Sequence, residues 1–190
     1  VSLSKFEDGH YSELVATVPF KTAALNNATL PATDKKALEE FSKKVGELRR
    51  VSAATDEYRK ELVNKIKYIK QAILETPKLS TGLFKTINDL EKRLTDANTK
   101  MNGDATVARR EFETLPSING RIGSIAGALW STTAAPTTTF INSLSVAEKQ
   151  FALVYNEIKA IGIAVTNIEL ELEKNKAPYT PGRLPVWSGN

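Results

Sequence analysis

Few side chains in this sequence are suited to chemistry, and they are scattered. His10 is the single histidine and cysteine is absent, so neither a zinc site nor a cysteine nucleophile is expected. Gly120, Gly123 and Gly127 follow no predicted strand, so they do not match the glycine loops that bind phosphates or dinucleotides. We therefore expect no metal and no cofactor.

Acidic side chains are plentiful, but they lie among lysines. Glycoside hydrolysis needs two carboxyl groups facing each other across a cleft, one of them with a raised pKa. The acidic groups considered for this role are Glu39, Glu40, Asp56, Glu57, Glu169, Glu171 and Glu173. Lysines alternate with them on predicted helix faces, which is typical of a solvated surface. We predict that this segment is not an enzyme.

Arginines and aromatic residues are better candidates for binding. Arg109 and Arg110, adjacent in an irregular segment, suit either an acidic partner or the carbonyl groups at a helix C-terminus. Trp130, Trp187 and Tyr179 offer flat faces for a sugar, although core packing is the commoner role of such residues. The full set of candidate interaction residues is Arg109, Arg110, Arg121, Trp130, Tyr179, Arg183 and Trp187.

The strongest structural pattern runs from Phe140 to Leu172. Apolar residues recur there at steps of four and three, which places them on one stripe of a helix that a partner must cover. They are Phe140, Leu144, Ala147, Phe151, Val154, Ile158, Ile161, Val165, Ile168 and Leu172. We predict a helix from Pro136 to about Asn175, with an outer surface that carries no function because the apolar stripe is used for packing.

Three further helices are predicted over residues 34–74, 80–102 and 117–130. The first has two apolar seams separated by a polar middle at Ser52 and Thr55. Asn102-Gly103 is a typical helix C-terminus.

The short helix over residues 117–130 contains three interior glycines. Each lowers helix stability by ~1 kcal/mol relative to alanine. We interpret Gly120, Gly123 and Gly127 as sites of close backbone contact with the following helix.

The helix lengths predict the architecture. A forty-residue helix is ~60 Å long, and the two shorter helices together nearly match one such length. The expected fold is mainly α: an elongated antiparallel helical bundle with two long helices and a broken middle leg of two shorter helices. Residues 177–190 should form an extended tail that packs on the bundle.

An N-terminal β-hairpin is predicted, with strands over residues 1–6 and 10–20 around the turn Asp8-Gly9. A lone hairpin is marginally stable in water. It should therefore either lean on the helices or be the last piece of a sheet whose other strands lie upstream, and we favour the second interpretation. The expected division is residues 1–26 as hairpin and 27–190 as bundle and tail. Asn27-Ala28-Thr29 also matches a glycosylation sequon.

Composition narrows the class of protein. The 190 residues are 41% apolar, and the net charge of +4 is spread rather than clustered, so a nucleic-acid partner is not expected. No apolar stretch approaches the eighteen or so residues of a membrane span, and no signal peptide is visible. The chain begins with valine, which indicates a fragment of a longer protein.

Several strings then carry a family resemblance. MNGDATVARR and PSINGRIGSIAGALWSTTAAPT lie within residues 101–137, and APYTPGRLPVW covers residues 177–187. In this order, and flanked by long helices, they resemble the C-terminal helical region of large bacterial sortilin-type propeller proteins, described as glycosyl hydrolase-like or BNR-repeat proteins. The resemblance implies an upstream propeller and a small β-sandwich in the same chain, and a secreted or periplasmic location. Any hydrolytic site would lie on the propeller.

Two hypotheses about function follow. The first is a non-catalytic helical accessory or interaction module at the C-terminus of such a protein, with the upstream domains, another protein or a glycan as partner. The alternative is a carbohydrate- or small-ligand-binding module that uses Trp130, Trp187 and Tyr179. A weaker third hypothesis is self-association through leftover apolar surface.

Overall fold

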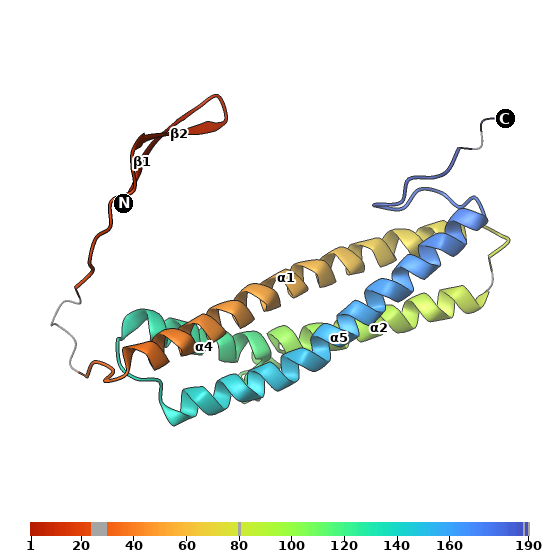
Figure 1. Ribbon diagram of the computed structural model, residues 1–190. Helices are drawn as coiled ribbons and strands as arrows, with labels where there is room; N and C mark the ends of the chain where they lie inside the picture. Colours follow the sequence, from red (N-terminus) through yellow and green to blue (C-terminus); the bar gives the residue numbers. More distant parts are fainter. Residues whose placement is uncertain (24–29, 80, 188, 190) are drawn as a thin grey trace.

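The structure is an elongated helical bundle, as predicted (Figure 1). The computed structural model describes residues 1–23, 30–79, 81–187 and 189. The helices, in chain order, are α1 (Lys35–Leu74), α2 (Thr81–Asn102), α3 (Ala105–Ala108), α4 (Ile118–Ser131) and α5 (Thr138–Lys174). Helices α1 and α5 run in one direction, and α2 followed by α4 returns in the other, so α2 and α4 form the broken middle leg (Figure 1).

The helix ends follow the local signals in the sequence. Asp34 and Ser117 cap α1 and α4, each accepting a hydrogen bond from the backbone N–H three residues on, at 2.9 and 3.1 Å. Gly103 ends α2 with φ 85°, a conformation that favours glycine. Pro136 is not the first residue of α5, because Thr137 is the cap. Ser80, where the second predicted helix begins, lies outside the described residues.

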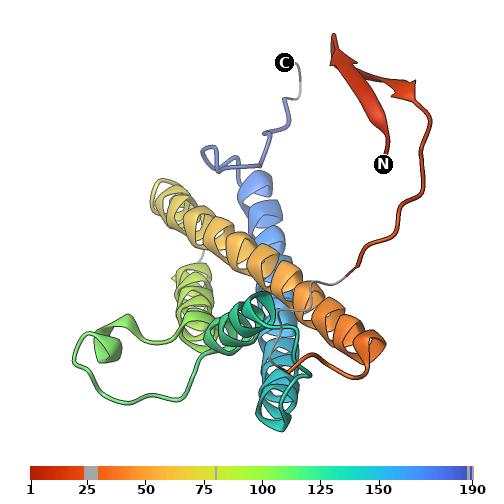
Figure 2. The ribbon, with the colours of Figure 1, turned by 90° about the vertical axis from the view of Figure 1, so that its left-hand side faces the viewer.

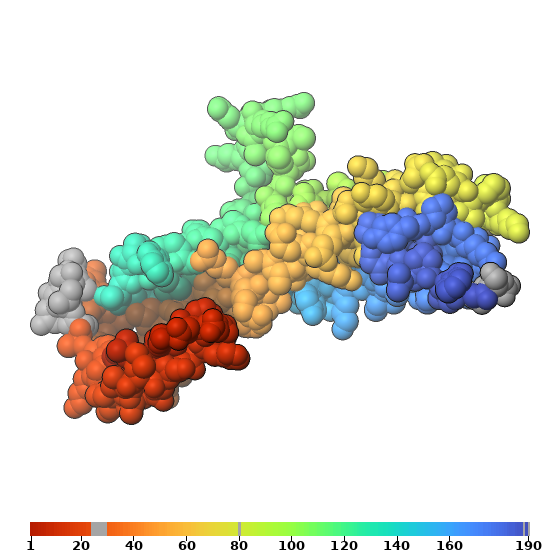
Figure 3. All heavy atoms as spheres, turned by 90° about the horizontal axis from the view of Figure 1, so that it is seen from above, coloured from red at the N-terminus to blue at the C-terminus, as the bar shows by residue number. Residues whose placement is uncertain are grey.

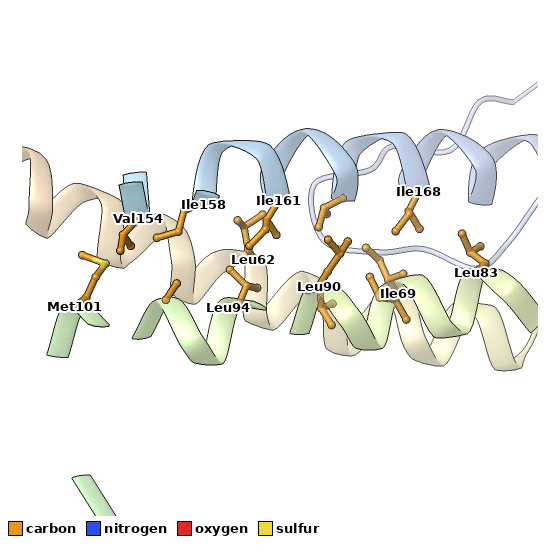
Figure 4. Close-up of a cluster of buried hydrophobic side chains, with 14 of the residues drawn as sticks. Leu62, Ile69, Leu83, Leu90, Leu94, Met101, Val154, Ile158, Ile161 and Ile168 are labelled. Atoms are coloured by element: carbon orange, nitrogen blue, oxygen red, sulfur yellow. The ribbon is translucent and has the colours of Figure 1, made fainter. Parts of the chain in front are cut away.

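Besides Ile118 and Ile122 from the start of α4, the main core is formed by α1, α2 and α5. Figure 4 shows their side chains meeting between the three helices. The labelled residues are Leu62, Ile69, Leu83, Leu90, Leu94, Met101, Val154, Ile158, Ile161 and Ile168. Burying each leucine or isoleucine side chain contributes ~1.5–3 kcal/mol, so these apolar seams define the bundle.

A smaller cluster holds α4 against the N-terminal parts of α1 and α5. Its fully buried members are Val45, Ile125 and Leu144. Half-buried side chains surround them: Phe41, Leu48, Ala126, Leu129 and Phe140. This end of the bundle therefore buries less apolar surface than the other.

The predicted reason for the glycines in α4 is wrong. A Cβ atom at Gly123 or Gly127 would meet nothing within 4 Å, and one at Gly120 would meet only the Ser117 hydroxyl that caps the same helix. The close contact lies instead at Gly162 of α5, where an added Cβ would collide with the Tyr58 hydroxyl of α1.

The hairpin consists of β1 (Leu3–Glu7) and β2 (His10–Val15), paired antiparallel. Asp8 and Gly9 have φ of 52° and 81°, as a type I′ turn requires. The register of the strand pairing shifts between Leu3 and Ser4. Strand β2 ends at Val15, whereas the predicted strand ran to residue 20. Val1 and Val18 still exchange two backbone hydrogen bonds, at 2.7 and 2.9 Å, beyond that irregularity.

The hairpin does not lean on the helices. Every residue from 1 to 23 is exposed, and neither strand contacts a helix within the part of the chain that the structure describes. Phe6 and Tyr11 contact each other, with ring centroids 4.7 Å apart, yet both remain largely exposed. The predicted boundary at residue 26 and the sequon at residues 27–29 lie outside the described residues.

The prediction that no apolar stretch approaches the length of a membrane span is wrong for α5. This helix contains an eighteen-residue window with mean hydropathy 1.2, long and apolar enough to cross a membrane by composition alone. Only 39% of that window is buried. The buried residues of α5 are the predicted stripe without Phe140, which is half-buried, and with Gly162 added; they pack in the bundle core. Such a core helix passes this test as a membrane helix does, so the observation is weak evidence for a span.

The segment between α2 and α4 projects from the side of the bundle (Figures 2 and 3). Its only helical turn is α3, which has no buried residue. Gly103 and Ser117, at its two ends, lie close together, since an added Cβ at Gly103 would be 3.9 Å from Cβ of Ser117. We call residues 104–116 the arm.

Candidate interaction surfaces

The predicted interaction residues do not form one surface. Trp130 lies near the end of α4, and the following segment accepts a hydrogen bond from the residues just before α1, from the Ala32 N–H to the Thr133 carbonyl at 2.8 Å. The tail lies beside Lys65, whose Nζ would be 3.4 Å from a Cβ added at Gly182. These two places are thirty residues apart along α1, or ~45 Å at 1.5 Å per residue.

The three aromatic candidates are exposed rather than packed in the core, which corrects the favoured prediction. Exposed fractions are 93% for Trp130, 87% for Trp187 and 63% for Tyr179. Their exposure suits binding, but the separation of Trp130 from the tail prevents the three rings from enclosing a single small ligand. The alternative hypothesis therefore loses the site it was based on.

Arg183 is not a surface residue, because it is 8% exposed and fastens the tail. Its Nε donates to Oγ1 of Thr180 at 3.2 Å, and Nη2 donates to the Ala177 carbonyl at 2.9 Å and also to the Pro178 carbonyl. Nη1 forms an ion pair with Glu173 in the last turn of α5. An arginine does clamp a helix C-terminus in this protein, but it is Arg183.

Glu173 holds the tail from the helix side. Its Oε1 accepts a hydrogen bond from the Val186 backbone N–H at 2.8 Å. That bond and the Arg183 guanidinium lower the pKa of Glu173, against a smaller opposing effect of desolvation. The tail thus packs on the bundle as predicted as far as Arg183, whereas Leu184, Val186 and Trp187 point into solvent.

Arg109 and Arg110 lie on the arm and are exposed. Neither side chain hydrogen-bonds a helix end or forms an ion pair with any described residue, so the clamp interpretation is not supported. Asp104, Glu111 and Glu113 share the arm with them. Because three acids accompany two bases, the arm has no excess positive charge with which to select an acidic partner.

Arg121 faces the bundle more than the solvent. Its side chain is half-buried, and its Nε is fully buried without a hydrogen-bond partner among the described residues. It is therefore a poor candidate for a contact with another molecule.

A polar junction lies where the middle leg breaks. Ser52 Oγ donates to Asn119 Oδ1 at 2.6 Å, and Asn119 Nδ2 donates to Asn102 Oδ1 at 2.8 Å. Asp56 Oδ1 then accepts from Asn102 Nδ2 at 3.1 Å and from Arg59 Nε at 2.8 Å. The junction joins α1 to the end of α2 and the start of α4, so it explains Ser52 in the polar middle of α1, whereas Thr55 donates to the Val51 carbonyl of its own helix at 2.8 Å.

The electrostatics of Asp56 are those of a structural carboxylate. Burial by itself would raise the pKa of Asp56, but hydrogen bonds from Arg59 and Asn102 and the charges of Arg59 and Lys60 outweigh it and lower that pKa. Asp56 is therefore ionised at neutral pH.

Other perturbed carboxyl groups show the same direction. All those in the described residues have a lowered pKa, mostly because a basic side chain or a backbone N–H lies beside them: Glu39, Glu47, Asp56, Asp104, Glu157 and Glu173. A general acid for glycoside cleavage needs the opposite shift. The described residues also contain no cluster of three or more potential metal ligands.

Among the hollows on the described part of the bundle, two bear on binding, and the sequence predicted neither. One, of about 420 Å³, lies at the base of the arm and is lined in part by Leu115, Pro116 and Leu153. The other, of about 600 Å³, lies between α1 and α5 beside Tyr58 and Gly162. The only sequence signal for the second was a glycine inside a strongly apolar helix.

Helix α5 is also less saturated by internal packing than predicted. Leu153, Ile163 and Leu170 are exposed large apolar residues away from the buried stripe. Its outer face can therefore contribute to binding.

In comparisons with known proteins, no protein-family model, no curated protein and no solved structure matches this chain. The fold and its surfaces define an elongated antiparallel helical bundle with an exposed hairpin, arm and tail.

Proposed function

We propose that this chain is a non-catalytic helical accessory module at the C-terminus of a secreted or periplasmic, glycosyl hydrolase-like propeller protein. Its partners in this proposal are the upstream propeller and β-sandwich of the same polypeptide. The resemblance of residues 101–137 and 177–187 supplies this context. Lowered carboxyl pKa values are compatible with an accessory role.

The observation that carries the proposal is the hairpin. Two paired strands with exposed apolar side chains, namely Phe6, Tyr11, Leu14 and Val15, contact no helix in the described chain. A two-stranded hairpin is marginal by itself, and its outer edges can pair with further strands. An upstream sheet would supply both the missing strands and a cover for these side chains.

Amide hydrogen exchange of residues 3–15 tests the proposal. In the isolated chain these amides should exchange quickly, since the hairpin lacks packing. In the full gene product they should be protected at least tenfold more, while amides within α5 serve as an internal control that stays unchanged. Equal exchange of the hairpin in both proteins would contradict attachment through it.

A truncation tests the accessory role separately. Deleting residues 30–190 from the full gene product should lower its thermal stability or remove an interaction, while the hydrolytic centre, if present, stays intact. If stability, secretion and all interactions were unchanged, the helical region would have no accessory role.

A further inference from the structure

The groove between α1 and α5 has the size and lining of a small-ligand site. Its volume is about 600 Å³, within the range of ~300–1,000 Å³ usual for such sites. Tyr58 and Tyr155 line it together with aliphatic side chains and the backbone of Gly162. Both tyrosines are only partly covered, with exposed fractions of 43% and 42%.

Gly162 is the residue that allows this groove to exist in its present form. The Tyr58 hydroxyl lies against the position that a Cβ atom would occupy there. With any other residue at 162, Tyr58 would have to move. A helix interior disfavours glycine. The contact with Tyr58 in the groove therefore explains why position 162 is a glycine.

The polar groups of the groove are biased toward one charge. Arg50 and Lys159 are its cations, and no carboxyl group lines it. Arg50 is occupied by Glu47, at 2.7 Å, whereas Lys159 has no ion-pair partner within 4 Å among the described residues. The hydroxyl groups of Tyr58 and Tyr155 likewise form no hydrogen bond with a described residue.

We propose that the α1–α5 groove binds a ring-bearing carboxylate, with the ring against the tyrosine side chains and the carboxylate at Lys159. Aromatic faces bind flat rings, and an ammonium group binds a carboxylate through charge-assisted hydrogen bonds. Two sources share this chemistry: a uronate unit of an acidic polysaccharide and an aromatic acid. One lysine with a single neighbouring arginine does not make the clustered footprint that nucleic acid needs. This inference does not depend on the proposed attachment to upstream domains.

Titration calorimetry on the whole chain tests the groove with three probes: a galacturonate trimer, 4-hydroxybenzoate and a neutral glucose trimer. We expect saturable binding of one or both acids and none of the neutral sugar. Binding of the galacturonate trimer alone assigns the polysaccharide source, and binding of hydroxybenzoate alone assigns the aromatic acid. Absence of binding by both acids up to ~10 mM would overturn the proposal.

Substitutions localise the binding. Lys159→Gln should weaken it by roughly tenfold or more, because a charge-assisted hydrogen bond is lost. Lys149→Gln removes the same charge from an exposed position on the same helix that does not line the groove, so it should bind as the original chain does. Unchanged binding by Lys159→Gln, with the fold intact by circular dichroism, would place the ligand elsewhere and contradict the proposal.

Discussion

The two ends of the bundle are built from similar helices but packed differently. Where α1, α2 and α5 meet, long rows of leucine and isoleucine are fully buried. Where α4 replaces α2, a smaller cluster centres on Val45, Ile125 and Leu144, while Ile118 and Ile122 at the start of α4 belong to the main core. Breaking the middle leg therefore divides the protein into a tightly packed end and a looser one, joined at the polar junction. Local opening is expected to begin at α4, where fewer apolar contacts must be lost.

The largest difference should appear when the two cores are truncated. Leu94→Ala, in the tight core, should lower the free energy of unfolding by ~3–5 kcal/mol, because it leaves a cavity among fully buried side chains. Leu129→Ala, in the looser cluster, removes a half-buried side chain and should cost only ~1–2 kcal/mol. Urea unfolding measures both, and equal losses would mean that the two ends are equally well packed.

The fastening of the tail at the tight end should have the next largest effect. Arg183→Ala removes the donor of several hydrogen bonds to the tail. The amides of Ala177 and Val186, which donate to the Leu172 carbonyl and to Glu173, should then exchange roughly tenfold faster, while those of α2 change little, because the loss is local. Lys176→Ala, an exposed basic residue at the same helix end, is the matched control. If these amides exchanged as slowly in Arg183→Ala as in Lys176→Ala, the packing of the tail would not depend on Arg183.

Glycine substitutions sharpen the contrast between close and loose packing. Gly123→Ala and Gly127→Ala, in α4, should each raise the free energy of unfolding by ~0.5–1 kcal/mol, since nothing opposes the added methyl group. Gly162→Ala should lose that gain because it collides with Tyr58. Thermal unfolding of the three variants decides the matter. Destabilisation by the α4 substitutions would restore the idea that these glycines permit close helix contact.

The junction between the two ends should contribute a small dependence of stability on pH. Because the pKa of Asp56 is lowered in the folded chain, its contribution is present above the unfolded pKa, about pH 4, and is lost as the pH falls through the folded value. Asp56→Asn should therefore flatten the stability profile below pH 4. Glu39→Gln, whose partner Lys43 is exposed, should change that profile less. If both variants flattened the stability profile below pH 4 equally, the pH dependence would come from the net charge of the chain and not from the junction.

Much of the fold was predictable because it depends on local patterns. Apolar steps of four and three placed α5, and the predicted helix starts at residues 34 and 117 lie within one residue of the observed ones. The Asp8-Gly9 turn was equally local. These features need only the nearest neighbours in sequence, so no knowledge of the tertiary structure was required.

The candidate site was less predictable because its parts come from distant segments. The structural role of Asn102 and Asn119 depends on hydrogen bonds that link them to Ser52 and Asp56 of α1. The role of Gly162 likewise depends on Tyr58, which lies against it. Arg183 looked like a surface residue because two of the four acceptors around it are backbone carbonyls, which no sequence pattern displays. The exposure of Trp130 and Trp187 was missed for the same reason, since aromatic residues near helix ends are found in both environments.

The arm has a consequence for protein engineering. Its two ends, Gly103 and Ser117, lie side by side, so the helices are positioned independently of how much chain runs between them. Closing a longer loop over the same gap adds only ~0.6 kcal/mol for each doubling of its length. A peptide tag, a fluorescent domain or a foreign binding loop grafted between Arg110 and Glu111 should therefore be carried outward on the bundle while α2 and α4 keep their places.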